Sequence, residues 1–289
     1  AEGGAPATDH SAEPWAAPIE HPVGDYTVRI RISDERARLN VNLLLNAEGG
    51  VDAAARARLR RLFLALPWSA TLDAEAMLDA LADWMDRAAE GEAEAGLYEE
   101  GARNARLETV DELSSIAGFD PLAVSGWAGG RGLDPFPGLA DLLTRWTADA
   151  KVNVNTVPRE ALLTLSDAMS EGKVAAILAR RAERPFESLD DLASLPGIDE
   201  GYGAGQTFLG ELGPGGADLL SVVSDTFRVD IEAVRDGVVE ARARQVVLRA
   251  PAEGAPGASA PGATVTELSW DPDPILPAGE GEAAEGEAQ

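Results

Sequence analysis

The spacing of apolar residues changes twice along the chain, and this change constrains the fold more than any other feature of the sequence. Apolar and polar residues alternate in three runs, at 26–32, 227–233 and 238–249. Alternation with a period of two predicts strands that bury one face. Asp236-Gly237 separates the last two runs and predicts a tight hairpin turn. Both ends of the chain are therefore expected to contribute β-structure.

Between these runs the apolar residues follow a helical period. The clearest stripes lie at 59–66 and, after Pro67, at 72–85. Shorter helices are expected at about 109–117, 136–147, 158–168, 170–183 and 188–195. One strand near Tyr26 and one isolated hairpin each bury too little apolar surface to be stable alone, so we expect them to pair. The helical segment is then an insertion into a β-domain.

We therefore predict an α+β fold in which an antiparallel sheet carries a large inserted α-helical domain. The Pro-rich and acidic start of the chain predicts an extended lead-in, Thr264 to Trp270 could add an edge strand, and the end has no periodicity. The predicted parts are a lead-in at 1–22, a β-domain in two segments at 23–46 and 219–270, a helical domain at 47–218, and an acidic disordered tail at 271–289.

The charge balance excludes several functions. With 24 basic and 50 acidic side chains, the formal net charge is -26, which opposes binding to nucleic acid and to anionic lipid. The absence of Cys excludes thiolate metal sites and Cys nucleophiles. His10 and His21, the only histidines, both lie in the lead-in, so a His-based triad is not expected. We predict that the protein is not an enzyme.

Membrane segments are not expected within these residues. The apolar runs, such as 62–66, are far shorter than the roughly 18 residues that a membrane span requires. Residues 1–22 have neither the basic start nor the apolar core of a signal peptide.

A thirteen-residue pattern occurs twice in the helical part, at 107–119 and 186–198. Each copy has a Thr or Ser at the expected helix start, an acidic residue three positions later and a Gly stop. The second copy is similar to a helix-hairpin-helix unit, and such a unit can bind DNA through backbone amides. Asp199 and Glu200 follow the hairpin and would repel phosphate, so a structural helical repeat is the favoured interpretation.

The triplet Asn-Val-Asn also occurs twice, at 40–42 and 153–155. Asn side chains bond nearby backbone groups, and the second triplet leads into Thr156 and Pro158, which suit a helix start. The favoured interpretation is a turn with a helix cap, and the alternative is a set of amides in a polar site.

An acidic cluster at the end of the predicted helix 72–85 is the candidate ion site, because Ca²⁺ takes six to eight oxygen ligands and tolerates flexible loops. The alternative is a solvated acidic face. The predicted ligands are Asp83, Asp86, Glu90, Glu92 and Glu94.

Taken together, the ordered motifs resemble the minor pseudopilin K family of bacterial type II secretion systems. The resemblance covers roughly residues 25–249. It rests on Tyr26-Thr-Val-Arg-Ile, Asp34-Glu35, Arg38-Leu-Asn-Val-Asn, Arg60-Arg-Leu-Phe, Asp83-Trp-Met-Asp, residues 107–116, Asn153-Val-Asn-Thr with Pro158, Arg184-Pro-Phe, Leu189-Asp-Asp-Leu and Val223-Ser-Asp-Thr-Phe.

The resemblance implies a pseudopilin-like sheet interrupted by a helical domain, with a non-enzymatic role. Members sit at the tip of a short periplasmic filament, bind the minor pseudopilins I and J, and help to start assembly and to engage exported proteins. Calcium is associated with the family's Asp-Trp-Xaa-Asp loop. Asp83 and Asp86 match its start, Glu94 suits a later ligand, and Ala88 stands where another Asp is often found.

The predicted function is therefore that of a tip pseudopilin that forms a heterotrimer with I and J, with the major pseudopilin and exported proteins as further possible partners. The resemblance implies a periplasmic domain of an inner-membrane-anchored bacterial protein, attached through an N-terminal helix that the residues given lack. The alternatives are a helix-hairpin-helix DNA-binding protein of the competence type and a carboxylate-dependent hydrolase.

Overall fold

The computed structural model describes residues 8–66, 72–86, 102–129, 134–167, 169–212, 218–250 and 264–271. It divides into two compact units. The sheet unit comprises residues 1–39 and 146–274, and the helical unit comprises residues 40–145 and 275–289.

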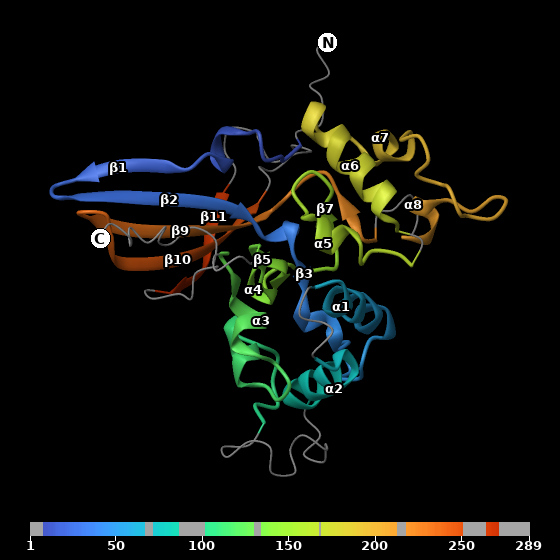
Figure 1. Cartoon of the computed structure of the whole chain (residues 1–289), viewed down its shortest axis with the longest axis horizontal. Coiled ribbons are helices and arrows are strands. Elements are labelled where there is room, and N and C mark those ends of the chain that lie inside the picture. The colour runs from blue at the N-terminus through green and yellow to red at the C-terminus, as the bar shows by residue number, and fades with distance from the viewer. Residues whose placement is uncertain are drawn as a thin grey trace. The chain divides into compact units, whose positions relative to one another are not determined.

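The sheet unit is built on a five-stranded antiparallel sheet with the order β1-β2-β9-β10-β11 (Figure 1). Strand β2 pairs with β9 from Thr27 opposite Val234 to Asp34 opposite Phe227. The expected pairing of the early strand with the late hairpin is therefore confirmed, as is the expected edge strand. The strands are β1 (Ile19–Val23), β2 (Tyr26–Asp34), β9 (Thr226–Arg235), β10 (Val238–Ala250) and β11 (Thr264–Asp271).

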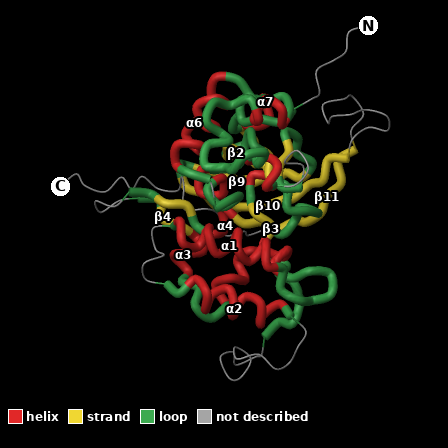
Figure 2. The backbone as a smooth tube through the Cα atoms, turned by 90° about the vertical axis from the view of Figure 1, so that its right-hand side faces the viewer, coloured by secondary structure: helices red, strands yellow, loops and turns green. Residues whose placement is uncertain are grey.

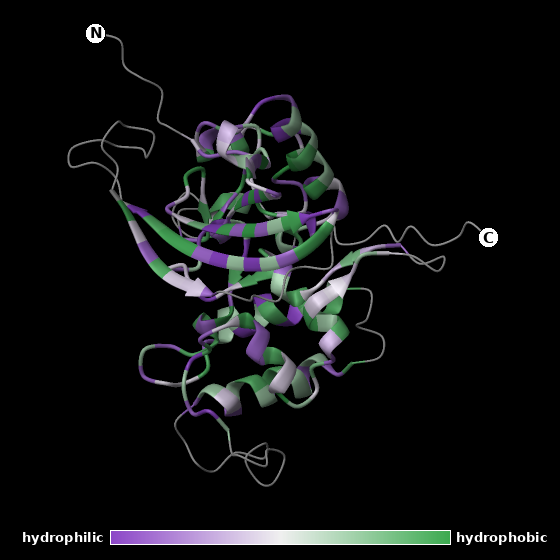
Figure 3. Ribbon diagram, turned by 90° about the vertical axis from the view of Figure 1, so that its left-hand side faces the viewer, coloured by the Kyte–Doolittle hydropathy of each residue, from purple (hydrophilic) through white to green (hydrophobic). Residues whose placement is uncertain are grey.

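The hairpin turn lies where the sequence predicted it. Asp236 and Gly237 join β9 to β10 with φ angles of 53° and 81°, and two successive positive φ values are typical of a type I′ turn, whose twist matches that of the strands. Alternating hydrophilic and hydrophobic residues along the sheet strands are visible in Figure 3.

The start of the chain departs from the predicted extended lead-in. Residues 19–23 form the edge strand β1, and a 3₁₀ helix η1 (Pro14–Ala16) precedes it. The ring of Trp15 packs edge-on against that of Phe227, with the ring centroids 5.2 Å apart. The prolines of this segment indicated an extended lead-in and not a strand. An edge strand tolerates Pro22, because only one side of the strand needs backbone donors.

Helices from the C-terminal half of the chain belong to the sheet unit, which corrects the predicted helical domain at 47–218. The short strand β7 pairs in parallel with β8, directly before β9, and so ties the intervening helices to the sheet. Phe186 and Phe208 are fully buried in this part. Its elements are β7 (Val152–Asn153), α5 (Arg159–Leu162), α6 (Glu171–Glu183), α7 (Leu189–Ala193), α8 (Phe208–Glu211) and β8 (Leu220–Ser221).

The helical unit packs α1 against α2, and these helices contain most of the two predicted apolar stripes (Figure 2). Phe63 from α1 and Leu78 from α2 are fully buried, and the side chains of Asp52 and Asp73 cap the two helices. The elements are η3 (Val41–Leu44), α1 (Ala53–Ala65), α2 (Ala74–Met85), η5 (Val110–Ser115), α3 (Pro121–Ser125), β4 (Gly126–Trp127), β5 (Phe136–Pro137), α4 (Leu139–Leu142) and β6 (Leu143–Thr144). Residues 35–37 form η2, and β3 (Leu39–Asn40) spans the division between the units.

The expected helix at 136–147 contains only the four residues of α4, because Pro137 and Gly138 extend the chain before it and β6 follows directly. The predicted tail, apart from Asp271, lies outside the described residues. Within the described ranges, no helix has both the length and the apolar character that a membrane crossing needs.

Candidate functional site

The predicted calcium ligands begin at the C-terminal end of α2. Asp83 lies in the last turn of the helix, and Asp86 caps it with its backbone N–H donating to the carbonyl of Ala82 at 2.8 Å. The two carboxylates are three residues apart, and both residues are partly exposed. The structure therefore brings this pair to one helix end, where the exposed carbonyls carry partial negative charge that suits a hard cation.

The other three predicted ligands, Glu90, Glu92 and Glu94, lie outside the described residues. The described residues alone do not contain a group of three or more acidic or histidine side chains close enough to hold a metal ion.

A hollow of about 640 Å³ lies beside Asp86 in the helical unit. Two further carboxylates, Glu48 and Glu108, line it together with Arg103 and Arg106. Residue spacing does not link these two carboxylates to the acidic cluster, because they come from segments on either side of the two long helices. The remaining lining residues are Leu45, Asn46, Ala47, Gly49, Met85 and Ala105.

The two arginines of this hollow bind backbone carbonyls and carboxylates of the segments that line or adjoin it. Arg106 donates to the backbone carbonyls of Leu45 and Asn46 at 3.0 and 3.2 Å, and Arg103 forms ion pairs with Glu108 at 2.5 Å and Glu112 at 3.0 Å. Both arginines are thus engaged by the unit's own groups, and the lining sets the three carboxylates of Glu48, Asp86 and Glu108 against these two cations.

The two Asn-Val-Asn triplets make the same set of contacts, one in each unit. The first Asn of each triplet accepts a hydrogen bond from the backbone N–H of the second at 2.9 Å, which confirms the predicted turn. The second Asn of each triplet acts over a long range. Asn42 bonds both backbone groups of Leu107 at 2.9 Å, and Asn155 bonds both backbone groups of Phe186 at 3.0 and 2.7 Å.

These contacts join the two motifs that recur in the sequence. Leu107 and Phe186 open the two copies of the thirteen-residue pattern. The next element of each copy is also stabilised in a similar way, because Glu112 and Asp191 accept hydrogen bonds from the backbone N–H groups of Glu108 and Glu187 at 2.7 and 2.8 Å. Both motifs are therefore structural in this protein, and their amides do not form a ligand site.

The predicted helix-hairpin-helix repeats are not confirmed. In the first copy η5 is a 3₁₀ helix, and in the second copy residues 194–207 separate α7 from α8. The carboxylate of Asp199 accepts a hydrogen bond from the backbone N–H of Phe208 at 2.8 Å. This backbone N–H at the start of α8 already has a partner within the protein. This geometry does not support the DNA-binding interpretation.

A buried polar cluster surrounds Asp34 at the end of β2. Its carboxylate, with the residue 3% exposed, accepts hydrogen bonds from the hydroxyls of Ser224 and Thr156 and from the amide of Asn153. Burial raises the pKa of Asp34, and the hydrogen bonds oppose this effect. Because Ser224 is itself buried and donates to this carboxylate, the cluster joins three segments of the sheet unit and does not form a nucleophilic site.

Arg36 extends this polar region. It forms two hydrogen bonds with the carboxylate of Asp225, both at 2.8 Å, and a third with Asp149 at 2.7 Å. Burial alone would raise the pKa of Asp225, but the guanidinium of Arg36 outweighs it and lowers that pKa. Asp225 therefore stays ionised and holds Arg36 in place.

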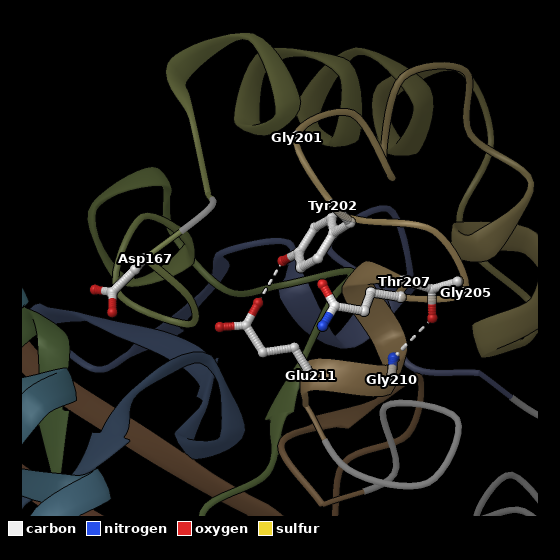
Figure 4. Close-up of a pocket in the computed structure, with 8 residues that line it drawn as sticks. Asp167, Gly201, Tyr202, Gly205, Thr207, Gly210 and Glu211 are labelled. Atoms are coloured by element: carbon white, nitrogen blue, oxygen red, sulfur yellow. Dashed lines mark hydrogen bonds between the residues drawn. The ribbon is translucent and has the colours of Figure 1, made fainter.

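A second hollow, of about 510 Å³, lies in the sheet unit beside Tyr202 (Figure 4). The hydroxyl of Tyr202 points toward the carboxylate of Glu211, which also accepts a hydrogen bond from Ser166 at 2.5 Å. Burial and the contact with Glu211 raise the pKa of Tyr202 to about 12. Tyr202 is thus a hydrogen-bond donor at neutral pH and not a base.

Comparisons with known proteins point to one family. Two family models, each described as type II secretion system protein K, match residues 37–126 and 152–210 and together span more than half of the chain. A comparison with curated proteins found no match.

The fold is similar to that of a chain in the crystal structure of the GspK–GspI–GspJ complex from the type 2 secretion system of enterotoxigenic Escherichia coli. The TM-score is 0.62 at 18% sequence identity, and the match covers 92% of this chain and 87% of that chain. At this sequence identity the structural likeness establishes the fold only, and the assignment to a family rests on the two family models.

Proposed function

The chain belongs to the type II secretion system protein K family, and we propose that it is the minor pseudopilin at the tip of the pseudopilus, where it assembles with minor pseudopilins I and J. In this role it helps to initiate the filament and supports protein export as a periplasmic, structural component.

The two family-model matches carry this proposal, because both describe the same protein and together they span more than half of the chain. The likeness to a chain of the GspK–GspI–GspJ complex adds support for a shared fold. The contacts described above agree with a structural role, since the buried polar residues brace the protein's own segments.

The direct test is assembly with purified I and J from the same organism. We expect the chain to form a 1:1:1 complex that elutes as one species in size-exclusion chromatography with light scattering. Omitting I or J in turn shows which partner contacts the chain. If the chain stayed monomeric in the presence of both, the proposed role would be wrong.

We further propose that the end of α2 binds calcium through Asp83 and Asp86, together with Glu90, Glu92 and Glu94 from the segment that follows. The support is the carboxylate pair at a helix end and the adjoining hollow, which Glu48 and Glu108 also line. A hard cation with a preference for six to eight oxygens suits this set of donors.

Calcium binding should raise the melting temperature, because a ligand that binds only the folded state stabilises it by mass action. Asp83→Asn with Asp86→Asn should abolish this gain, and isothermal titration calorimetry should report the lost site. Each titration needs a control at matched ionic strength, since a chain of charge -26 responds to any cation. A matched variant is Asp190→Asn with Asp191→Asn in α7, which should retain the gain. An undiminished gain in the Asp83 and Asp86 variant would place the ions elsewhere.

A further inference from the structure

The last strand of the sheet, β11, is exposed along most of its length. Its residues 265–268 are all exposed, and among its apolar side chains Val265 is 62% and Trp270 is 53% exposed. Among the described strands, β11 pairs only with β10 and ends the sheet order. An open edge that carries large exposed apolar side chains is a template for pairing with another chain.

The opposite edge of the sheet is protected in ways that β11 is not. Strand β1 contains Pro22, which interrupts the row of backbone donors, and its Glu20 forms an ion pair with Arg29 at 3.0 Å. Strand β11 contains no Pro, Lys or Arg. Its register shift near Leu268 still leaves a regular ladder over Thr264–Glu267.

The charge of this edge indicates what can occupy it. The charged residues of β11 are Glu267 and Asp271, both acidic, and the chain as a whole has a formal charge of -26. A second copy of the same chain would bring like charges together, whereas a strand that carries Lys or Arg would complement them.

We propose that the open edge of β11 receives an extended segment of a neighbouring pseudopilin subunit, which adds one more antiparallel or parallel strand to the sheet. The incoming segment has apolar side chains beside Val265 and Trp270 and a Lys or Arg near Glu267. Backbone hydrogen bonds along the edge supply affinity, and these side chains supply selectivity. The proposal rests on the proposed assembly with I and J and adds the surface and the chemistry of the contact.

The test measures binding of the full chain to purified I and J, alone and together, by biolayer interferometry. Val265→Glu and Trp270→Glu should each weaken binding about tenfold or more, because each places a new charge at the contact. The matched control is Val238→Glu, at a valine of the same sheet that is 63% exposed and lies beside the β9–β10 turn. It should bind like the unaltered chain.

Hydrogen exchange gives a second readout that does not depend on substitutions. In the complex, amides of residues 264–271 should become protected, because strand addition engages the backbone and a side-chain contact alone does not. Unchanged exchange at 264–271 in a complex that forms, or full binding by both edge variants, would overturn the strand addition and leave the proposed function intact. Failure of the unaltered chain to bind I and J would overturn both.

Discussion

Single asparagines decide how segments far apart in the sequence meet in each unit. Asn42 and Asn155 bond the backbone N–H and carbonyl of Leu107 and Phe186, which are both almost completely buried. A buried backbone group without a partner costs roughly 1–3 kcal/mol. These side-chain amides therefore stabilise the segment before a distant helix, because they supply the backbone hydrogen-bond partners that a β-ladder or a helix turn would otherwise supply.

Asn155→Ala should lower the free energy of unfolding of the sheet unit by about 2–4 kcal/mol, because both backbone groups of Phe186 lose their partner. Urea denaturation followed by circular dichroism measures the loss. Asn155→Asp should be no milder than Ala, since it replaces the donor to the carbonyl of Phe186 with a buried carboxylate oxygen that repels it. A loss below about 0.5 kcal/mol for Asn155→Ala would contradict the role of this contact.

Asp225 should make stability depend on pH. Its folded-state pKa lies below the unfolded value of about 3.9, because Arg36 stabilises the ionised form against the effect of burial. A group with a lowered pKa contributes stability above its unfolded pKa and loses it as the pH falls through its folded pKa. The unaltered chain should therefore be more stable than Asp225→Asn at pH 7, and this difference should shrink below about pH 4.

Thermal unfolding of both proteins at pH 7 and about pH 3 measures this difference and avoids the isoelectric point near 4.3, where solubility is lowest. Asp218→Asn removes an exposed carboxylate outside the Arg36 network and serves as the control. A difference between Asp225→Asn and the unaltered chain that stayed constant across this range would exclude the ion pair as its cause.

At the scale of elements, local chemistry sets where helices and turns begin and end. Asp52, Asp73 and Ser170 each cap a helix by accepting a hydrogen bond from a backbone N–H in its first turn. These signals are contained in a few consecutive residues, and the bounds of α2 and α6 lie within two residues of the predicted helices 72–85 and 170–183.

Two glycines in different elements should respond oppositely to the same substitution. Gly237→Ala should destabilise the protein by about 1–2 kcal/mol, because a φ of 81° strains any residue with a Cβ although the site has open space. Gly172→Ala should stabilise it by about 1 kcal/mol, since this exposed residue lies inside α6 and Ala favours helix. Differential scanning calorimetry compares both with the unaltered chain, and equal signs would contradict the explanation.

At the scale of the whole molecule, the net charge of -26 opposes the compact state through self-repulsion. Raising NaCl from about 0.01 M to about 0.15 M shortens the Debye length from about 30 Å to about 8 Å. We expect a rise in melting temperature of about 2–4 °C, as for a gain of ~1 kcal/mol. Salt also weakens surface ion pairs, but these contribute little each, so repulsion should dominate. A fall in melting temperature would show that the ion pairs outweigh it.

The candidate site could be predicted only in part. The position of Asp83 and Asp86 at a helix end follows from the apolar stripe at 72–85, and this stripe is a pattern of neighbouring residues. The neighbouring Glu48 and Glu108 could not be found in this way, because the hollow joins them to Asp86 only where residues 45–49 and 103–108 meet the end of α2. No residue spacing encodes that arrangement.

The sequence by itself determined the type of the longest elements, the hairpin turn and the family, because each depends on neighbouring residues or on the order of short motifs. Tertiary structure alone decided that β1 joins the sheet, that helices α5 to α8 belong to the sheet unit, and that Asp34 meets Ser224 and Thr156. Each of these outcomes depends on burial and hydrogen bonding between segments far apart in the chain. Such contacts form only when the folded backbone brings their partners together.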